Sequence, residues 1–266
     1  MLIIILPAIF AFAGNENPLP RSEVTTLFEE GNKLFREANE LAASDQESAR
    51  GVYLQSAMRF ERIIRDGGIR NGRLFYNTGN AYFLSGDIGR AILNYRKAQD
   101  YIPNDINLKQ NLEYARERRV DRIEITQKER VLETLFFWHY DISRKTRSIA
   151  FGVFFVLFWL TAGTRLFVKR SFAVWTMIVS GIFALMFLVS LLIDIGRNRT
   201  TKPGVIIQEE VIARKGDSET YEPSFKEPLH AGTEFELLES RHDWHHVALA
   251  DGRTCWLPSK TSELVR

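Results

Sequence analysis

The 266-residue chain is 45% hydrophobic and 26% charged, with a net charge of +2, which is ordinary for a soluble protein of two small domains. Neither Ser22 to Ile142 nor Pro203 to Arg266 has an excess of basic residues, which argues against a nucleic-acid partner. The apolar residues are unevenly spread, however, and two long runs of them argue against a purely water-soluble chain.

The first residues form an apolar run that is too short to span a membrane. This run ends in Ala11-Phe12-Ala13, a small-x-small pattern typical of a signal-peptide cleavage site, although no Lys or Arg precedes Arg21. We predict a signal peptide at residues 1–13 and export of the segment that follows it.

Residues 72–103 have the spacing of a helical hairpin. Apolar and small residues recur at helical intervals on either side of Ser85-Gly86-Asp87, and Gly79 allows a second backbone to approach closely. The motif positions are Phe75, Gly79, Tyr82, Ala91, Tyr95, Ala98 and Pro103. Their offsets resemble those of the tetratricopeptide (TPR) repeat, a helical hairpin that binds other proteins and catalyses nothing.

One such repeat cannot bury its own apolar faces, so its neighbours should be similar. Leu27, Gly31 and Leu34 resemble the first helix of an upstream repeat, and Gly31 lies further from Gly79 than the usual period of about 34 residues allows. Downstream, Ile106 to Val120 fits a capping helix with a polar outer face. We therefore predict an all-α TPR region at residues 22–120 whose first repeat is degenerate.

Four asparagines recur on the expected first helices and the capping helix, which would line the concave face of the repeats. They are Asn32, Asn77, Asn80 and Asn111. An asparagine amide offers both a donor and an acceptor, so these side chains could hold the backbone of an extended peptide. The equally weighted alternative is that asparagine is simply common at these positions, and that the short groove packs against a partner instead.

Two apolar runs, at residues 148–168 and 172–193, are each long enough to cross a hydrocarbon core of about 30 Å as a helix. The short link between them predicts a two-helix transmembrane hairpin, preceded by an aromatic-rich juxtamembrane helix at residues 121–147. Basic residues at the ends of both runs fit headgroup-level anchors, and Asp194 fits a boundary residue. The anchors are Arg144, Lys145, Arg147, Arg165, Lys169, Arg170, Arg197, Arg199 and Lys202.

The hairpin places both soluble regions on one side of the membrane. Its basic residues are more numerous on the side of these regions, which by the positive-inside rule would be cytoplasmic. The signal-like start favours export instead. We give it more weight, because the segment that precedes a hairpin largely sets its orientation. The expected location is the bacterial inner membrane, multi-pass, with periplasmic soluble domains.

Residues 203–266 alternate as short strands separated by turn signals, of which Asp251-Gly252 is a strong hairpin signal. The run from Val211 through Asp251-Gly252 to Trp256-Leu257-Pro258 resembles the bacterial SH3 domain, with Cys255 where that family usually has glycine. This resemblance implies a small all-β SH3-like barrel. Trp244 and Trp256 fit core or rim positions of the barrel better than ligand contacts.

The sequence offers little evidence for a catalytic or metal site. Cys255 is the only cysteine, and it lies in an expected strand, whereas nucleophilic cysteines usually sit at a helix start. His242, His245 and His246 could form a metal site, but adjacent strand residues point to opposite faces. We expect no enzyme activity, no metal and no cofactor.

The order of signal-like start, TPR pair, two membrane spans and SH3-like domain resembles the BatE-type proteins of Bacteroides aerotolerance operons. This resemblance implies partners, namely membrane-anchored von Willebrand A-domain proteins and a MoxR-type ATPase system. We expect a non-enzymatic adaptor that uses its TPR region and SH3-like domain for protein–protein interaction in an envelope-stress complex. The alternative is a cell-wall sensor whose SH3-like domain binds peptidoglycan.

Overall fold

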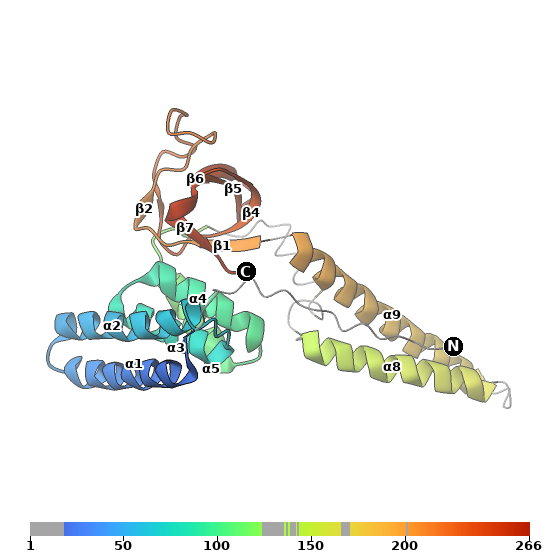
Figure 1. Ribbon diagram of the computed structural model, residues 1–266. Helices are drawn as coiled ribbons and strands as arrows, with labels where there is room; N and C mark the ends of the chain where they lie inside the picture. Colours follow the sequence, from blue (N-terminus) through green and yellow to red (C-terminus); the bar gives the residue numbers. More distant parts are fainter. Residues whose placement is uncertain are drawn as a thin grey trace, which may run out of the picture.

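The computed structural model describes residues 19–123, 136, 138, 142, 144–165, 171–200 and 202–266. These residues form a helical part, a pair of long apolar helices and a β part (Figure 1). The coarse prediction of helices, two apolar helices and a β unit is therefore confirmed. The predicted signal peptide, most of the juxtamembrane segment and the link between the apolar helices lie outside the described residues.

Five helices make up the helical part, and each packs against the one that follows it. They are α1 (Arg21–Leu41), α2 (Gln46–Arg65), α3 (Gly72–Ser85), α4 (Ile88–Tyr101) and α5 (Ile106–Arg118). The side chains of Asp45, Asn71, Asp87 and Asp105 accept hydrogen bonds from first-turn N–H groups and so begin α2 to α5. Gly86 ends α3 at a φ of 96°, which glycine adopts without strain.

Two glycines let paired helices approach closely. A Cβ atom at Gly79 would lie 2.6 Å from the Tyr95 ring, and one at Gly31 would lie 2.6 Å from the Phe60 ring. The other helical motif positions are buried between α3 and α4, whereas Pro103 is exposed in the turn after α4. The buried ones are Phe75, Tyr82, Ala91, Tyr95 and Ala98.

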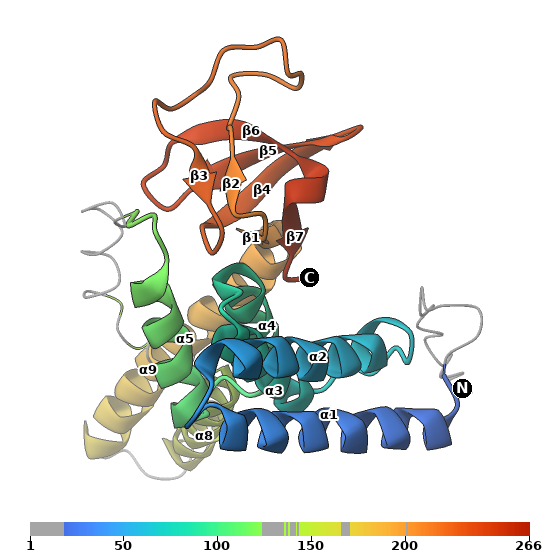
Figure 2. The ribbon, with the colours of Figure 1, turned by 90° about the vertical axis from the view of Figure 1, so that its left-hand side faces the viewer.

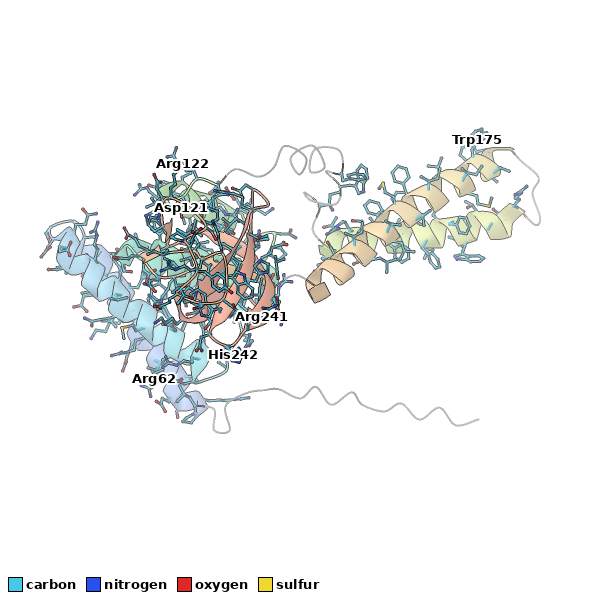
Figure 3. All side chains as sticks on the ribbon, turned by 90° about the horizontal axis from the view of Figure 1, so that it is seen from above. Arg62, Asp121, Arg122, Trp175, Arg241 and His242 are labelled. Carbon is cyan, nitrogen blue, oxygen red and sulfur yellow. The ribbon has the colours of Figure 1, made fainter. Side chains whose placement is uncertain are left out.

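The two apolar helices are α8 (Arg144–Arg165) and α9 (Ser171–Thr200), which pack against each other along their length (Figure 1). Segments Lys145–Arg165 and Phe172–Asp194 are long and apolar enough to cross a membrane, judged by length and composition. The pair extends away from the other described residues, with Trp175 at its far end (Figure 3).

The β part contains a five-stranded antiparallel sheet in the order β6-β5-β4-β1-β7, and β2 pairs separately with β3. The strands are β1 (Lys202–Ile206), β2 (Glu210–Val211), β3 (Leu229–His230), β4 (Glu234–Arg241), β5 (Trp244–Leu249), β6 (Thr254–Pro258) and β7 (Ser262–Leu264), and a short 3-10 turn, η1 (Ser259–Thr261), precedes β7. The hairpin expected at Asp251-Gly252 joins β5 to β6, and Gly252 there has a φ of 84°. The sequence predicts strands at residues 205–207, 211–213, 234–238, 244–249 and 255–257, and the short strands β3 and β7 are additional to these.

The helical and β parts form one packed body, with β1 lying on α4 (Figure 2). Successive residues of β1 point to opposite sides, so Val205 enters the helical core while Ile206 enters the β core. Val265, just after β7, joins the helical core too. The predicted capping helix α5 therefore does not end the helical array alone, because the β part covers α4 and α5.

Gly89 marks the closest backbone approach in this contact. A Cβ atom there would lie 2.8 Å from the carbonyl oxygen of Ile206 and 3.1 Å from the Cα atom of Ile207. We expect Gly89→Ala to lower the free energy of unfolding by about 1–3 kcal/mol, because two backbones must separate.

Gly51→Ala is the matched control, since a Cβ at this exposed position in α2 meets nothing within 4 Å. It should stabilise the protein by about 0.5–1 kcal/mol through helix propensity. Urea unfolding of both variants in detergent measures the difference. Equal stability of the two would mean that β1 and α4 are not in contact in solution.

Candidate functional site

The structure brings together two of the four asparagines, Asn80 on α3 and Asn111 on α5. Asn80 Oδ1 accepts hydrogen bonds from Tyr95 Oη at 2.8 Å and from Asn111 Nδ2 at 3.0 Å. Asn111 Nδ2 also donates to Tyr76 Oη at 3.0 Å. We call these four residues the amide cluster. Burial, with a smaller contribution from Tyr76, raises the pKa of Tyr95, so its hydroxyl remains a donor.

These contacts fix the position of both amides, and each amide keeps one polar group that can bind a ligand. Within the described residues, Asn80 Nδ2 and Asn111 Oδ1 form no hydrogen bond, and both side chains are only half-buried. One donor and one acceptor are therefore held at fixed positions on neighbouring helices. This pair matches the alternating N–H and C=O groups of an extended peptide backbone.

The other two asparagines do not join the amide cluster. Asn32 on α1 and Asn77 on α3 are half-buried, and neither forms a side-chain hydrogen bond within the described part of the chain. Asn77 shares its helix with Asn80, whereas Asn32 belongs to the α1–α2 pair. The four predicted residues therefore do not form one continuous set.

The two tryptophans of the β part differ in environment. Trp256 on β6 is 9% exposed, stacks on His246 with ring centroids 4.8 Å apart and lies under the guanidinium of Arg241. Trp244 on β5 is half-buried and pairs in register with Pro258. His246 and Arg241 thus both contact the Trp256 ring and reduce the area that a ligand could reach.

The structure does not bring Cys255 and the histidines of β5 together as a pair in the β5–β6 ladder. No cluster of three or more metal-ligating side chains occurs among the described residues. In the β5–β6 ladder His246 opposes Trp256, whereas Cys255 opposes Val247. Burial raises the pKa of the Cys255 thiol to about 12, so it remains protonated and is a poor nucleophile.

A carboxylate of the β part lies among three arginines of the helical part. Glu234, at the start of β4, forms two hydrogen bonds of 2.8 Å with Arg116 of α5. Its oxygens also lie 3.3 Å from Arg119 Nη1 and 3.4 Å from Arg96 Nε. The Glu234 side chain is 21% exposed. Because charged groups are costly to bury unpaired, this cluster depends on the two parts being docked.

A second polar contact lies beside the first. Asp121, after α5, accepts hydrogen bonds from the backbone N–H of His230 and from Thr233 Oγ1, both at 2.6 Å. Burial alone would raise the pKa of Asp121, but the bonds from Thr233 and His230 hold it below its usual value. Further pairs, Lys97 with Glu263 and Asp100 with Arg266, lie at the β7 edge. No pattern in the sequence predicted this interface.

The apolar helix pair contains a buried ion pair that was also missed. Arg147 of α8 is 5% exposed and lies 2.5 Å from both Asp194 Oδ2 and Ser190 Oγ of α9. The sequence did not predict that the guanidinium of Arg147 faces the neighbouring helix, and its role as a headgroup anchor stays a prediction. Asp194 is partner to this cation at the end of the second apolar segment.

Comparison with known proteins assigns no relative: no protein-family model, no curated protein and no solved structure matches the chain. Function is therefore inferred from the residues and their contacts.

Proposed function

We propose that this protein is a membrane-anchored, non-enzymatic adaptor, in which TPR-type helices and an SH3-like β domain act together in a bacterial envelope complex. The observation that carries the proposal is the docking of the two soluble parts into one body. In chain order, α8 and α9 stand between residue 123 of this body and β1. A folded unit interrupted by two apolar helices fits a protein that holds partners at a membrane.

Membrane insertion accounts for the surface of α8 and α9. Large apolar side chains on both helices are exposed, among them Trp159, Leu160 and Trp175 at 60–68%. Such a surface is costly in water and favourable among lipid tails. The helix pair would act as an anchor whose two ends emerge on the same side.

Docking of the soluble parts also limits the topology. Glu234 follows the apolar helix pair in sequence and its arginines precede that pair, so their contact supports a topology with both parts on one side of the membrane. The signal-like residues 1–13 favour the periplasmic side. Because β1, β7 and the residues before β4 are covered by helices, a wall-binding role would have to use the opposite face of the β part.

The amide cluster is the proposed partner-binding surface. It offers a fixed donor and a fixed acceptor beside aromatic side chains, which suits an extended segment of a partner protein. By resemblance to BatE-type proteins, the partners are von Willebrand A-domain membrane proteins that work with a MoxR-type ATPase. No catalytic step is assigned to this chain.

The test is in-cell crosslinking of the full chain, followed by purification in detergent and mass spectrometry. Asn80→Asp keeps the oxygen that accepts from Tyr95 and Asn111 but removes the free donor and adds a charge. We expect recovery of A-domain membrane proteins to fall about tenfold or more, as for the loss of a well-placed hydrogen bond plus a charge mismatch.

Asn32→Asp is the matched control, because Asn32 lies on α1, outside the amide cluster. It should leave recovery unchanged. Equal recovery with wild type and Asn80→Asp would reject the amide cluster as the docking surface. Recovery of cell-wall material alone would favour the sensor alternative.

A further inference from the structure

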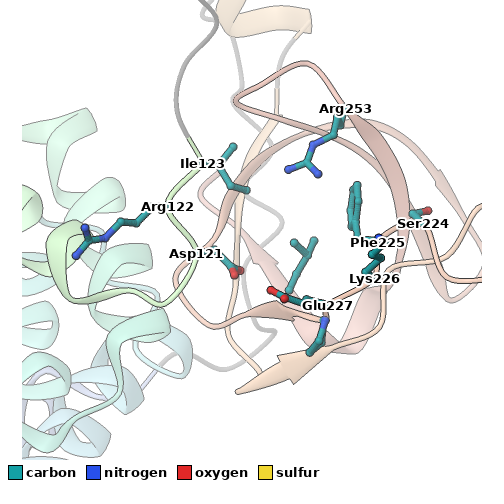
Figure 4. Close-up of a pocket in the computed structure, with 10 residues that line it drawn as sticks. Asp121, Arg122, Ile123, Ser224, Phe225, Lys226, Glu227 and Arg253 are labelled. Carbon is teal, nitrogen blue, oxygen red and sulfur yellow. The ribbon is translucent and has the colours of Figure 1, made fainter.

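A pocket of about 510 Å³ lies between the segment after α5 and the β part, away from the amide cluster (Figure 4). Its apolar lining comes from Ile123 on one side and from Phe225, Pro228 and Leu229 on the other. This volume is within the usual range for small-ligand sites, about 300–1,000 Å³. The pocket is thus large enough for a short peptide end.

Arg253 supplies the main polar group of this pocket. Its guanidinium points into the space between Ile123 and Phe225 (Figure 4) and lies 4.6 Å from the centroid of the Phe225 ring. Arg253 Nε donates to Asp251 Oδ2 at 2.6 Å, and its backbone N–H donates to Asp251 Oδ1 at 3.0 Å. Asp251 and the ring therefore hold the side chain in place.

The two terminal nitrogens of Arg253 form no hydrogen bond within the described part of the chain. Two parallel N–H donors on a planar guanidinium match the two oxygens of a carboxylate. Lys226 adds a second cation to the lining, and it has no ion pair among the described residues.

The remaining charged residues of the pocket limit which kinds of ligand can bind there. Asp121 is already occupied by His230 and Thr233, and Arg122 extends away from the pocket toward the helices (Figure 4). Glu227 also lines the pocket, and its charge is balanced by the neighbouring cation Lys226. The oriented guanidinium of Arg253, beside the apolar residues of the lining, suits a carboxylate attached to an apolar group. A phosphate, with more charge and no apolar substituent, would leave those walls uncovered.

We propose that this pocket binds the free C-terminal carboxylate of a peptide whose last side chains are apolar. The guanidinium of Arg253 donates hydrogen bonds to the carboxylate, and the apolar lining contacts the adjoining side chain. The inference is independent of the amide cluster, and it adds a second ligand site built jointly by the β part and the segment that follows α5. Two sources share this chemistry: a protein C-terminus, and a cell-wall stem peptide that ends in D-alanine.

The test is isothermal titration of the full chain in detergent with N-acetyl-Leu-Ala, with its C-terminal amide and with N-acetyl-Leu-D-Ala. We expect the acids to bind at least tenfold more tightly than the amide, because only a carboxylate accepts both guanidinium donors. Tighter binding of the D-alanine form would point to the cell wall, and tighter binding of the L-form to a protein end. Both outcomes support the carboxylate site.

Arg253→Gln should weaken binding of the acid about tenfold or more. Arg241→Gln is the matched control, since Arg241 is also half-exposed, also bonds a carboxylate two residues earlier and also lies over an aromatic ring. It should leave binding unchanged. Equal affinity for acid and amide, equal effects of the two variants, or no binding of any peptide would overturn the proposal.

Discussion

Replacing Glu234 by glutamine is expected to lower the free energy of unfolding of the soluble body by about 3 kcal/mol. The substitution keeps the shape of the side chain but removes the negative charge that Arg96, Arg116 and Arg119 share, and within the described residues only Arg116 keeps a second ion pair, with Glu113. The side chains of Glu234, Arg116 and Arg119 are 21%, 25% and 18% exposed, so water compensates little of the loss. The β part should therefore separate from α4 and α5 more readily.

Glu239→Gln provides the comparison on the same strand. Glu239 pairs with Arg241 at 2.6 Å, but both side chains are about half exposed. Exposed ion pairs contribute about 1 kcal/mol or less, so this variant should resemble wild type. Urea titration in detergent, followed by circular dichroism, measures both variants. If the two lose the same stability, the Glu234 cluster does not hold the parts together.

The Glu234 cluster should also make the docking of the two parts depend on pH, with weaker docking in acid. Burial would raise the pKa of Glu234, but Arg116, Arg96 and Arg119 together lower it below its usual value. A carboxyl whose pKa is lower when folded stabilises the docked state above its unfolded pKa of about 4.3. This contribution is lost as the pH falls through the lower, folded pKa. Asp121 shifts in the same direction and reinforces the effect.

Much of the helical pattern could be predicted from the sequence because it depends on local spacing. Gly31 and Gly79 stand where aromatic rings of the next helix require the absence of a Cβ, and that requirement leaves a visible glycine. Capping residues such as Asp87 and Asp105 similarly mark helix starts. The long apolar runs of α8 and α9 could be predicted from their amino-acid composition and length.

The docking of the two parts left no such signal. Val205 and Ile206 appear in the sequence as one apolar run, and nothing local shows that each enters a different core. Strand β7 has only three residues and exists because it pairs with β1. Glu234 and Arg116 lie far apart in sequence, and both are residue types that normally face water. Long-range pairing of this kind requires the fold.

Available amide groups were equally hard to foresee. The sequence identified Asn80 and Asn111 by position alone, together with Asn32 and Asn77, which lie outside the amide cluster. What distinguishes Asn80 and Asn111 is a hydrogen-bond partner on another helix, Tyr95 for the first and Tyr76 for the second. From the sequence alone, each tyrosine fits an ordinary core position of a helical hairpin. Only the arrangement of the helices shows that its hydroxyl bonds an asparagine.

Replacing Arg147 by leucine is expected to destabilise the α8–α9 pair by about 3 kcal/mol, because the buried contact between Arg147 and Asp194 is lost. The Arg147 side chain is 6% exposed and that of Asp194 18%, so neither charge is freely hydrated within the protein. Asp194→Leu should cost a similar amount for the converse reason. Thermal unfolding of the helical signal in detergent measures both changes.

The double variant Arg147→Leu/Asp194→Leu measures how much the ion pair itself contributes to stability, whereas each single variant measures the effect of leaving one partner behind. Replacing a buried ion pair by apolar side chains is often neutral or stabilising, so the double variant should recover most of the stability lost by either single change. Arg165→Leu is the control, because this exposed arginine lies at the opposite end of α8 and should have little effect. If the two single losses simply add in the double variant, Arg147 and Asp194 are not coupled, and each is held by other contacts.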